Sequence, residues 1–298
     1  MQLDASSPDS WRTHPRCNLQ ITNYQLQLLC PTLSTTDSPL PEAQPPLEMP
    51  PAPPPRDPVW SGWDVVMILV VAVLGIFSFG TLISLALWAT HHRLAAASPA
   101  MVRVMILAQS LSYIVVLLFM RELVVRHYHR RFAEAVRWHW PGEHRWLAYL
   151  LGGMGLAVAV QLVSMLLPIP KTLPIDRYFQ SRSVAYIMSL FGISMAPLVE
   201  ELFFRGFLYP VLARRLGIAI GVVLTALGFA LVHASQLASA WAPLLVLFMV
   251  GLVFTLVRVA TRNVAPGFLM HVGYNFMLFA MLYIATDHFR HMERMLQQ

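Results

Sequence analysis

The sequence predicts an all-α, polytopic transmembrane helical bundle of about seven to eight helices, with a disordered proline-rich N-terminal tail. Of its 298 residues, 57% are hydrophobic and only 12% are Asp, Glu, Lys or Arg, whereas a soluble domain carries about 25% charged residues. Several apolar segments approach the roughly 20 residues that a helix needs to span a bilayer. Ionisable side chains interrupt three of these segments, where each costs roughly 2.5–3.5 kcal/mol on insertion scales. A membrane protein with a polar site inside the bilayer accounts for all three observations.

The first 58 residues have a different composition from the rest. They hold 13 of the 22 prolines, and they end in "PEAQPPLEMPPAPPPRDP". Such a segment cannot form a helix or bury a core, so we expect a disordered tail with a polyproline-like spacer. Both cysteines, Cys17 and Cys30, lie in this tail, which leaves the membrane part without a thiol ligand or nucleophile.

The first three membrane helices are expected at 65–88, 104–120 and 146–167. Trp60, Trp63 and Trp88 bracket the first of them, as interfacial anchors do. The arginine-rich stretch that follows the second helix has apolar residues at helical spacing and predicts an interfacial amphipathic helix between residues 121 and 145. Its apolar positions are Phe132, Val136 and Trp140.

Four more helices are expected at 184–212, 218–237, 243–257 and 265–284. Pro197 lies inside the first of these, and its missing N–H and its ring predict a kink just before two glutamates. Gly217 and Gly221 begin the next helix and permit close helix contact. The "PIPKTLP" segment before these helices has room for a further half-helix.

This pattern divides the chain into four parts: the tail 1–58, N-terminal helices with the basic interfacial segment 59–183, a helical core 184–285, and a C-terminal tail 286–298. The formal net charge of +6 is expected in loops, where it sets orientation and meets anionic lipid. We expect no nucleic-acid partner. With seven crossings, the basic loops share a side with the N-terminus, which predicts a cytoplasmic N-terminus in a bacterial inner membrane. These loops hold the arginines of 121–145, Arg214, Arg215, Arg258 and Arg262.

Two adjacent acids in "APLVEELFFRGFLYP" are the first candidate site residues. On a helix, Glu201 and Arg205 are i and i+4 in the order that favours an ion pair. Glu200 lies about 100° around the helix, so its environment differs. We expect Glu201 to remain ionised beside Arg205, and Glu200 to act as general base or acid.

Two later apolar segments supply imidazoles. His233 lies in "ALGFALVHASQ", and His271 with Asn275 lies in "GFLMHVGYNFMLF" at i and i+4. A glutamate with a histidine can activate water, while a second histidine and an amide can stabilise an oxyanion. The same Glu/His/His set could hold a zinc ion with an open water position. The residue types alone leave both chemistries open.

These residues carry a resemblance. "EELFFR", "FALVH" and "HVGYN" resemble the EExxxR, FxxxH and HxxxN motifs of the CPBP family, the intramembrane proteases that include type II CAAX prenyl endopeptidases and bacterial Abi proteins. The resemblance covers roughly residues 184–285, in the family's order and spacing. The patterns of other intramembrane proteases, HExxH, GxSG and GxGD, do not occur in this sequence.

The resemblance implies hydrolysis of a peptide bond within or at the edge of the bilayer. By position, Glu200 would activate the water and His233 would share it, with Glu201 and Arg205 supporting the site. His271 and Asn275 would stabilise the oxyanion. The family is described as glutamic-type, and no histidine pair here has the HExxH spacing. We therefore expect no cofactor, with a divalent metal such as zinc kept as the alternative.

The expected substrate is a membrane protein or a lipidated peptide in the lipid bilayer: a CAAX-like C-terminus, a peptide precursor or a sorting segment. Two alternatives remain open. One is a non-proteolytic immunity or scaffold protein of the same family. The other is a proton-coupled transporter that uses Glu200 and His233 as a relay, although the internal repeats typical of transporters are not visible. The oligomeric state has no signature in the sequence.

Overall fold

The computed structural model describes residues 21–22, 25–26, 57–90, 98–170, 172–179 and 181–291. Residues 1–53 form a unit of their own. Its described part is a two-residue ladder, in which β1 (Ile21–Thr22) pairs antiparallel with β2 (Gln25–Leu26). The predicted disorder of the tail otherwise falls outside the described residues, as do positions 292–298 of the predicted C-terminal tail.

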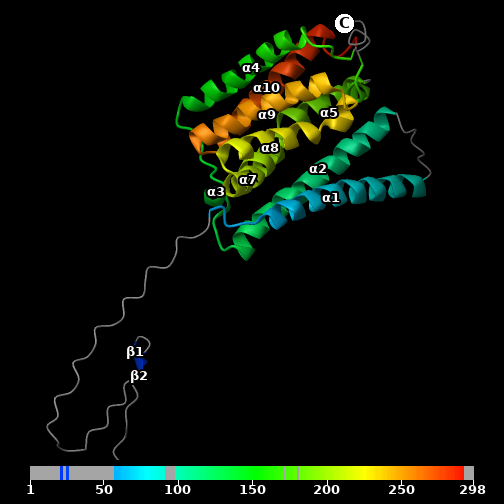
Figure 1. Ribbon diagram of the computed structural model, residues 1–298. Coiled ribbons are helices and arrows are strands. Elements are labelled where there is room, and N and C mark those ends of the chain that lie inside the picture. Colours follow the sequence, from blue (N-terminus) through cyan, green and yellow to red (C-terminus); the bar gives the residue numbers. More distant parts are fainter. Residues whose placement is uncertain are drawn as a thin grey trace, which may run out of the picture. The chain divides into compact units, whose positions relative to one another are not determined.

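In the second unit, from residue 54 onward, the regular elements of the described part are all helices (Figure 1). The predicted all-α class is therefore confirmed. Its first half contains α1 (Gly62–Ala89), α2 (Pro99–Glu122), α3 (Phe132–Ala135) and α4 (Arg145–Ser164). Its second half contains α5 (Arg182–Ile193), α6 (Met195–Glu201), α7 (Tyr209–Leu216), α8 (Ile218–Leu231), α9 (Trp241–Thr261) and α10 (Ala265–Ala285).

Six of the described helical segments are long and apolar enough to span a membrane. They are α1, α2 with its extension to His127, α4, the continuous segment Arg182–Leu216, α9 and α10. The chain is therefore an integral, multi-pass membrane protein. Of the seven predicted crossings, the fifth, 218–237, corresponds to α8. Its 14 residues extend roughly 21 Å at 1.5 Å each, short of the ~30 Å hydrocarbon core.

The predicted helix 218–237 ends early because His233 competes for a helix carbonyl. His233 Nδ1 bonds to the carbonyl oxygen of Phe229 over 2.8 Å, a side-chain bond that offers the backbone an alternative to the helix. The chain continues as a short 3-10 turn, Ala234–Leu237, and Ala238 then adopts a left-handed conformation.

The predicted amphipathic helix in 121–145 is wrong in extent. α2 continues as a π-helical turn, Leu123–His127, and only the four residues of α3 are helical beyond it. His129 and Arg137 have positive φ angles of 52° and 58°, which interrupts any longer helix. Val136 is fully buried whereas Trp140 is exposed, so the apolar residues of this segment do not form one membrane-facing stripe.

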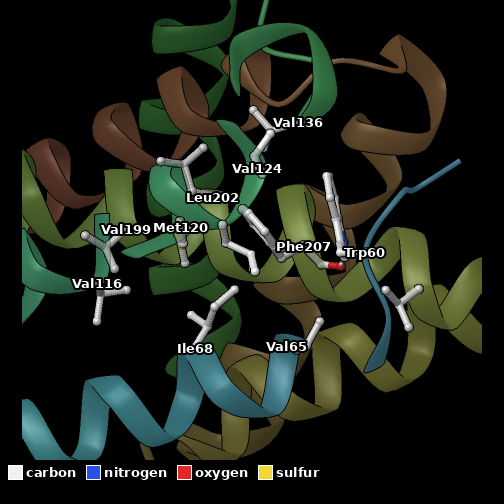
Figure 2. Packing of buried hydrophobic residues seen from close by; sticks show 12 residues of the cluster. Trp60, Val65, Ile68, Val116, Met120, Val124, Val136, Val199, Leu202 and Phe207 are labelled. Carbon is white, nitrogen blue, oxygen red and sulfur yellow. Dashed lines mark hydrogen bonds between the residues drawn. The ribbon is translucent and has the colours of Figure 1, made fainter. Parts of the chain in front are cut away.

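The α1–α2 hairpin is fixed to the segment Arg182–Leu216 by a buried apolar cluster (Figure 2). Trp60 stacks on Phe207 with ring centroids 4.5 Å apart, and its Nε1 donates to the Phe207 carbonyl over 3.1 Å. The cluster also contains Val65, Ile68, Val116, Met120, Val124, Val136, Val199 and Leu202. This packing fixes the position of the two adjacent glutamates.

The kink predicted at Pro197 is confirmed. Ser194 separates α5 from α6, with φ −114° and ψ −76°. Because Pro197 has no N–H, the carbonyl of Ile193 loses the donor that a continuous helix would provide. The two glutamates end α6, about one turn beyond Pro197.

A π-helical turn, Leu202–Leu208, follows α6 and was not predicted. Its last bond runs from the Tyr209 N–H to the Phe204 carbonyl, an i→i+5 pattern. The next donor in that pattern would be Pro210, which has no N–H, so the Arg205 carbonyl lacks an intrahelical partner. Arg258 Nε donates to it over 3.2 Å.

Arg258 was expected among the loop charges, and that prediction is wrong. It lies in the last turn of α9 with 4% of its surface exposed. The structural reason is that α9 continues to Thr261, four residues beyond the predicted end, and turns Arg258 toward the π-helical turn.

α4 lies along α10 (Figure 1), and two glycines allow this approach. A Cβ on Gly153 would lie 1.9 Å from the Met270 carbonyl oxygen, and one on Gly273 would lie 2.0 Å from the Leu150 carbonyl oxygen. Small residues at such positions let helix backbones meet within a membrane. This contact positions the α10 residues that follow.

Candidate active site

His271, from α10, joins the two glutamates of α6. Its Nδ1 lies 3.0 Å from Glu201 Oε1, and its Nε2 lies 3.7 Å from Glu200 Oε2. The tandem acids therefore lie at opposite edges of one imidazole, hydrogen-bonded to it only through Glu201, although their side chains leave the helix in different directions. This convergence brings together residues that lie 70 positions apart in the sequence.

Glu201 and Arg205 form the ion pair that their spacing predicts. Arg205 Nη1 donates to Glu201 Oε1 over 2.7 Å, and both side chains are completely buried. The guanidinium also donates to the Thr255 hydroxyl (3.3 Å) and to the Gly251 carbonyl (3.0 Å). Its carbon lies 4.7 Å from the centre of the Phe229 ring. With its donors engaged, Arg205 neutralises and orients Glu201.

The second oxygen of Glu201 occupies a confined position. Within the described chain, Oε2 has no hydrogen-bond partner, and a Cβ added to Gly267 would lie 2.9 Å from it. Any side chain at position 267 would displace this carboxylate. The glycine one helical turn before His271 therefore belongs to the site, although its surroundings could not be inferred from sequence.

The contacts of His271 indicate which of its ring nitrogens carries the hydrogen. A carboxylate can only accept, so Nδ1 carries the hydrogen that is donated to Glu201, and a neutral ring then has its lone pair on Nε2. That lone pair faces Glu200. The ring packs against Phe254, with centroids 4.9 Å apart, which holds its orientation.

His233 is oriented by the same logic. Its Nδ1 donates to the Phe229 carbonyl, so the neutral ring carries its lone pair on Nε2. The Phe229 ring lies next to both imidazoles, 5.1 Å from His233 and 5.8 Å from His271 between centroids. Phe229 thus spaces the two histidines, consistent with a packing role.

Asn275 lies one turn beyond His271 on α10. Its Nδ2 donates to the Gly192 carbonyl over 2.7 Å, near the break between α5 and α6. One N–H and the side-chain carbonyl oxygen of this amide remain for other partners.

A cavity of about 1080 Å³ connects these groups. Glu200, His233, His271 and Asn275 line it, while Glu201 and Arg205 do not. Among the described residues lining the cavity, Glu200 is the one carboxylate. Most of the remaining wall is apolar and comes from α1, α2, α4, α9 and α10. The adjacent acids therefore have different environments: Glu200 faces the cavity and Glu201 is sealed behind it.

Sequence reasoning missed the residues that surround this constellation. Thr255 and Gly251 hold Arg205 from α9 at i, i+4 spacing, and Gly267 makes room for Glu201. Gln109 and Tyr113 of α2 line the cavity as well. A polar i, i+4 pair within an apolar helix was the available signal for α2, but nothing in the sequence places its polar face next to Glu200.

In the described chain, no three His, Cys, Asp or Glu side chains come together as a group that could hold a metal. The donor geometry of the described residues therefore does not fit a zinc site. The expectation of a cofactor-free site remains a prediction.

Residues 182–277 match the family model described as type II CAAX prenyl endopeptidase Rce1-like. The match contains all six residues of the constellation and leaves out α1 to α4. No curated protein and no solved structure matches the chain.

Proposed function

Since residues 182–277 match the family model described as type II CAAX prenyl endopeptidase Rce1-like, we propose that this chain hydrolyses a peptide bond inside the membrane with a water activated by Glu200. The family match supports a CAAX-type membrane protease as the class of protein. The glutamate mechanism and the substrate are the proposal.

The observation that supports this proposal best is that one cavity is lined by a single carboxylate and two imidazoles. The Nδ1 atom of each imidazole is hydrogen-bonded. Glu200 takes a proton from the water, and the water oxygen bonds to the scissile carbonyl carbon. His233 Nε2 accepts the second hydrogen of that water and aligns it. When the tetrahedral intermediate collapses, the C–N bond breaks and Glu200 returns the proton to the leaving nitrogen.

Glu201 takes no proton in this scheme. Bonded to Arg205 and to His271 Nδ1, it fixes the His271 ring so that Nε2 faces Glu200. A positioned neighbour of this kind maintains the geometry that a near-attack arrangement requires. Asn275 has one N–H left to donate to the oxyanion, in keeping with the role that the resemblance implies.

The substrate is proposed to be a membrane protein segment or a lipidated peptide. The mainly apolar wall of a cavity of about 1080 Å³ suits a chain that enters from lipid and excludes a highly charged one. A cytoplasmic N-terminus in a bacterial inner membrane is also proposed. This proposal rests on the loop arginines, a group that does not include the buried Arg258.

The test compares membrane peptides by mass spectrometry in cells that express the parent protein or Glu200→Gln. The proposal expects a new C-terminus that depends on Glu200, with Glu134→Gln, an exposed acid on α3, cleaving like the parent. If Glu200→Gln folds and leaves every peptide terminus unchanged, the protease proposal fails. If Glu200→Gln then retained the cellular role of the protein, the scaffold alternative would be favoured. If the variant lost proton-coupled uptake, the transporter alternative would be favoured.

A further inference from the structure

α2 contributes a polar face to the cavity that holds Glu200. Gln109 and Tyr113 both line it, and as i and i+4 residues they lie on the same side of the helix. Glu200 lines the same cavity from α6, so the phenol and the carboxylate border one space although they come from different helices. Gln109 and Tyr113 both lie outside the family match, 182–277.

The position of Tyr113 is tied to the catalytic segment. Its ring stacks on Phe191 of α5, with centroids 5.6 Å apart and planes inclined by 26°. The next residue, Gly192, accepts the hydrogen bond from Asn275. The last turn of α5 therefore contacts both the tyrosine and the asparagine.

The site also lacks donors for the charge that hydrolysis creates. His271 gives its Nδ1 hydrogen to Glu201, and in the neutral ring Nε2 accepts instead of donating. One N–H of Asn275 is bound to Gly192. Of the donors expected from sequence, a single amide N–H remains for an oxyanion next to neutral His271, whereas oxyanion holes commonly combine two donors.

We infer that the Tyr113 phenol donates a hydrogen bond to the oxygen that becomes negative on the scissile carbonyl, and so completes an oxyanion hole with Asn275. This inference rests on the proposed function. As the activated water adds to the carbonyl carbon, the C=O π electrons move to oxygen. The phenol binds that oxygen without transferring its proton, and the carbonyl re-forms when the C–N bond breaks.

The packing of its ring positions this donor. Phe191 fixes the plane of the ring. A phenol has an ordinary pKa near 10, so it remains a neutral donor at the pH at which a glutamate base works.

Tyr113→Phe tests the inference, because it removes the hydroxyl and retains the ring that packs on Phe191. With purified full-length protein in lipid vesicles and the substrate peptide found by mass spectrometry, kcat is expected to fall about 10²–10³-fold, as for the loss of one oxyanion donor. KM is expected to stay within about twofold of the parent value. Tyr149→Phe, on α4 and away from the cavity lining, is the matched control with parent kinetics.

A second measurement separates stabilisation of the intermediate from binding of the substrate. In the Glu200→Gln background, which cannot cleave, adding Tyr113→Phe is expected to leave the Kd of the substrate peptide unchanged. Parent-like kcat in Tyr113→Phe would overturn the inference, and so would a weakened Kd in the double variant. If the parent protein cleaves nothing, the proposed function fails; if only Tyr113→Phe cleaves normally, this inference alone fails.

Discussion

Arg258 Nε donates to the backbone carbonyl of Arg205 over 3.2 Å, so one buried arginine supports the main chain of another. The Arg205 carbonyl needs this donor because Pro210 has no N–H to offer it within the π-helical turn. The Arg205 side chain then holds Glu201, and Glu201 holds His271. A line of contacts thus extends from α9 to the imidazole beside Glu200.

Arg258→Met is expected to leave the Arg205 carbonyl without a donor. An unpaired buried carbonyl costs about 1–3 kcal/mol, so thermal unfolding in detergent should occur at a lower temperature and cleavage should weaken. Arg262→Met, an exposed arginine in the following loop, is the control and should change stability by less than about 0.5 kcal/mol. Equal unfolding temperatures for the two variants would show that Arg258 does not support the π-helical turn.

Glu201→Gln should destabilise the protein strongly. It leaves the Arg205 cation buried without its counter-charge, a change that typically costs about 3–5 kcal/mol. Denaturant unfolding followed by tryptophan fluorescence measures the loss.

The double variant Glu201→Leu with Arg205→Met separates folding from chemistry. Replacing a buried pair by apolar residues is often neutral for stability, so the protein should fold. It should still not cleave, because His271 Nδ1 has lost its acceptor. Cleavage by the double variant at the parent rate would contradict the positioning role of Glu201.

Gly267→Ala should impair activity through a single methyl group. The added carbon would lie 2.9 Å from Glu201 Oε2 and would shift the carboxylate that orients His271. A misplacement of about 1 Å can cost up to 10²-fold in rate, which a kcat measurement would detect. Gly155→Ala on α4, where an added carbon meets nothing within 4 Å, should cleave like the parent and be up to about 1 kcal/mol more stable.

Trp60→Phe should weaken the attachment of the α1 end to the catalytic segment. The variant keeps a ring against Phe207 but loses the hydrogen bond to its carbonyl, worth about 0.5–1.5 kcal/mol. Trp63→Phe alters a side chain that is 76% exposed and should have a smaller effect. The same unfolding assay compares the two, and a larger loss at Trp63 would refute the role of Trp60.

Much of the fold followed from apolar length and proline position. The segments at 243–257 and 265–284 were predicted within a few residues, and the break at Pro197 was located correctly. The extent of α8 was not predicted, because the end of that helix depends on a side-chain bond from His233 that apolar composition does not reveal. The 121–145 segment failed for a related reason: positive φ angles at His129 and Arg137 have no clear sequence signature.

In the site, spacing alone predicted the ion pair of Glu201 with Arg205 and the different surroundings of Glu200. The contact between His271 and both acids depends on how α10 packs on α6, which no local pattern encodes. The π-helical turn had a usable signal in Pro210. Arg258 was assigned to a loop because the charge itself suggested the end of a helix.

The limited length of α8 has a bearing on where a substrate is cut. Starting beside Arg214 and Arg215, a helix of roughly 21 Å leaves about a third of a ~30 Å hydrocarbon layer beyond its last turn, and His233 follows directly. Scission would therefore occur closer to the leaflet on the other side from those arginines. The two cleavage products would then carry apolar segments of unequal length, and the product with the shorter segment would dissociate from the membrane more readily.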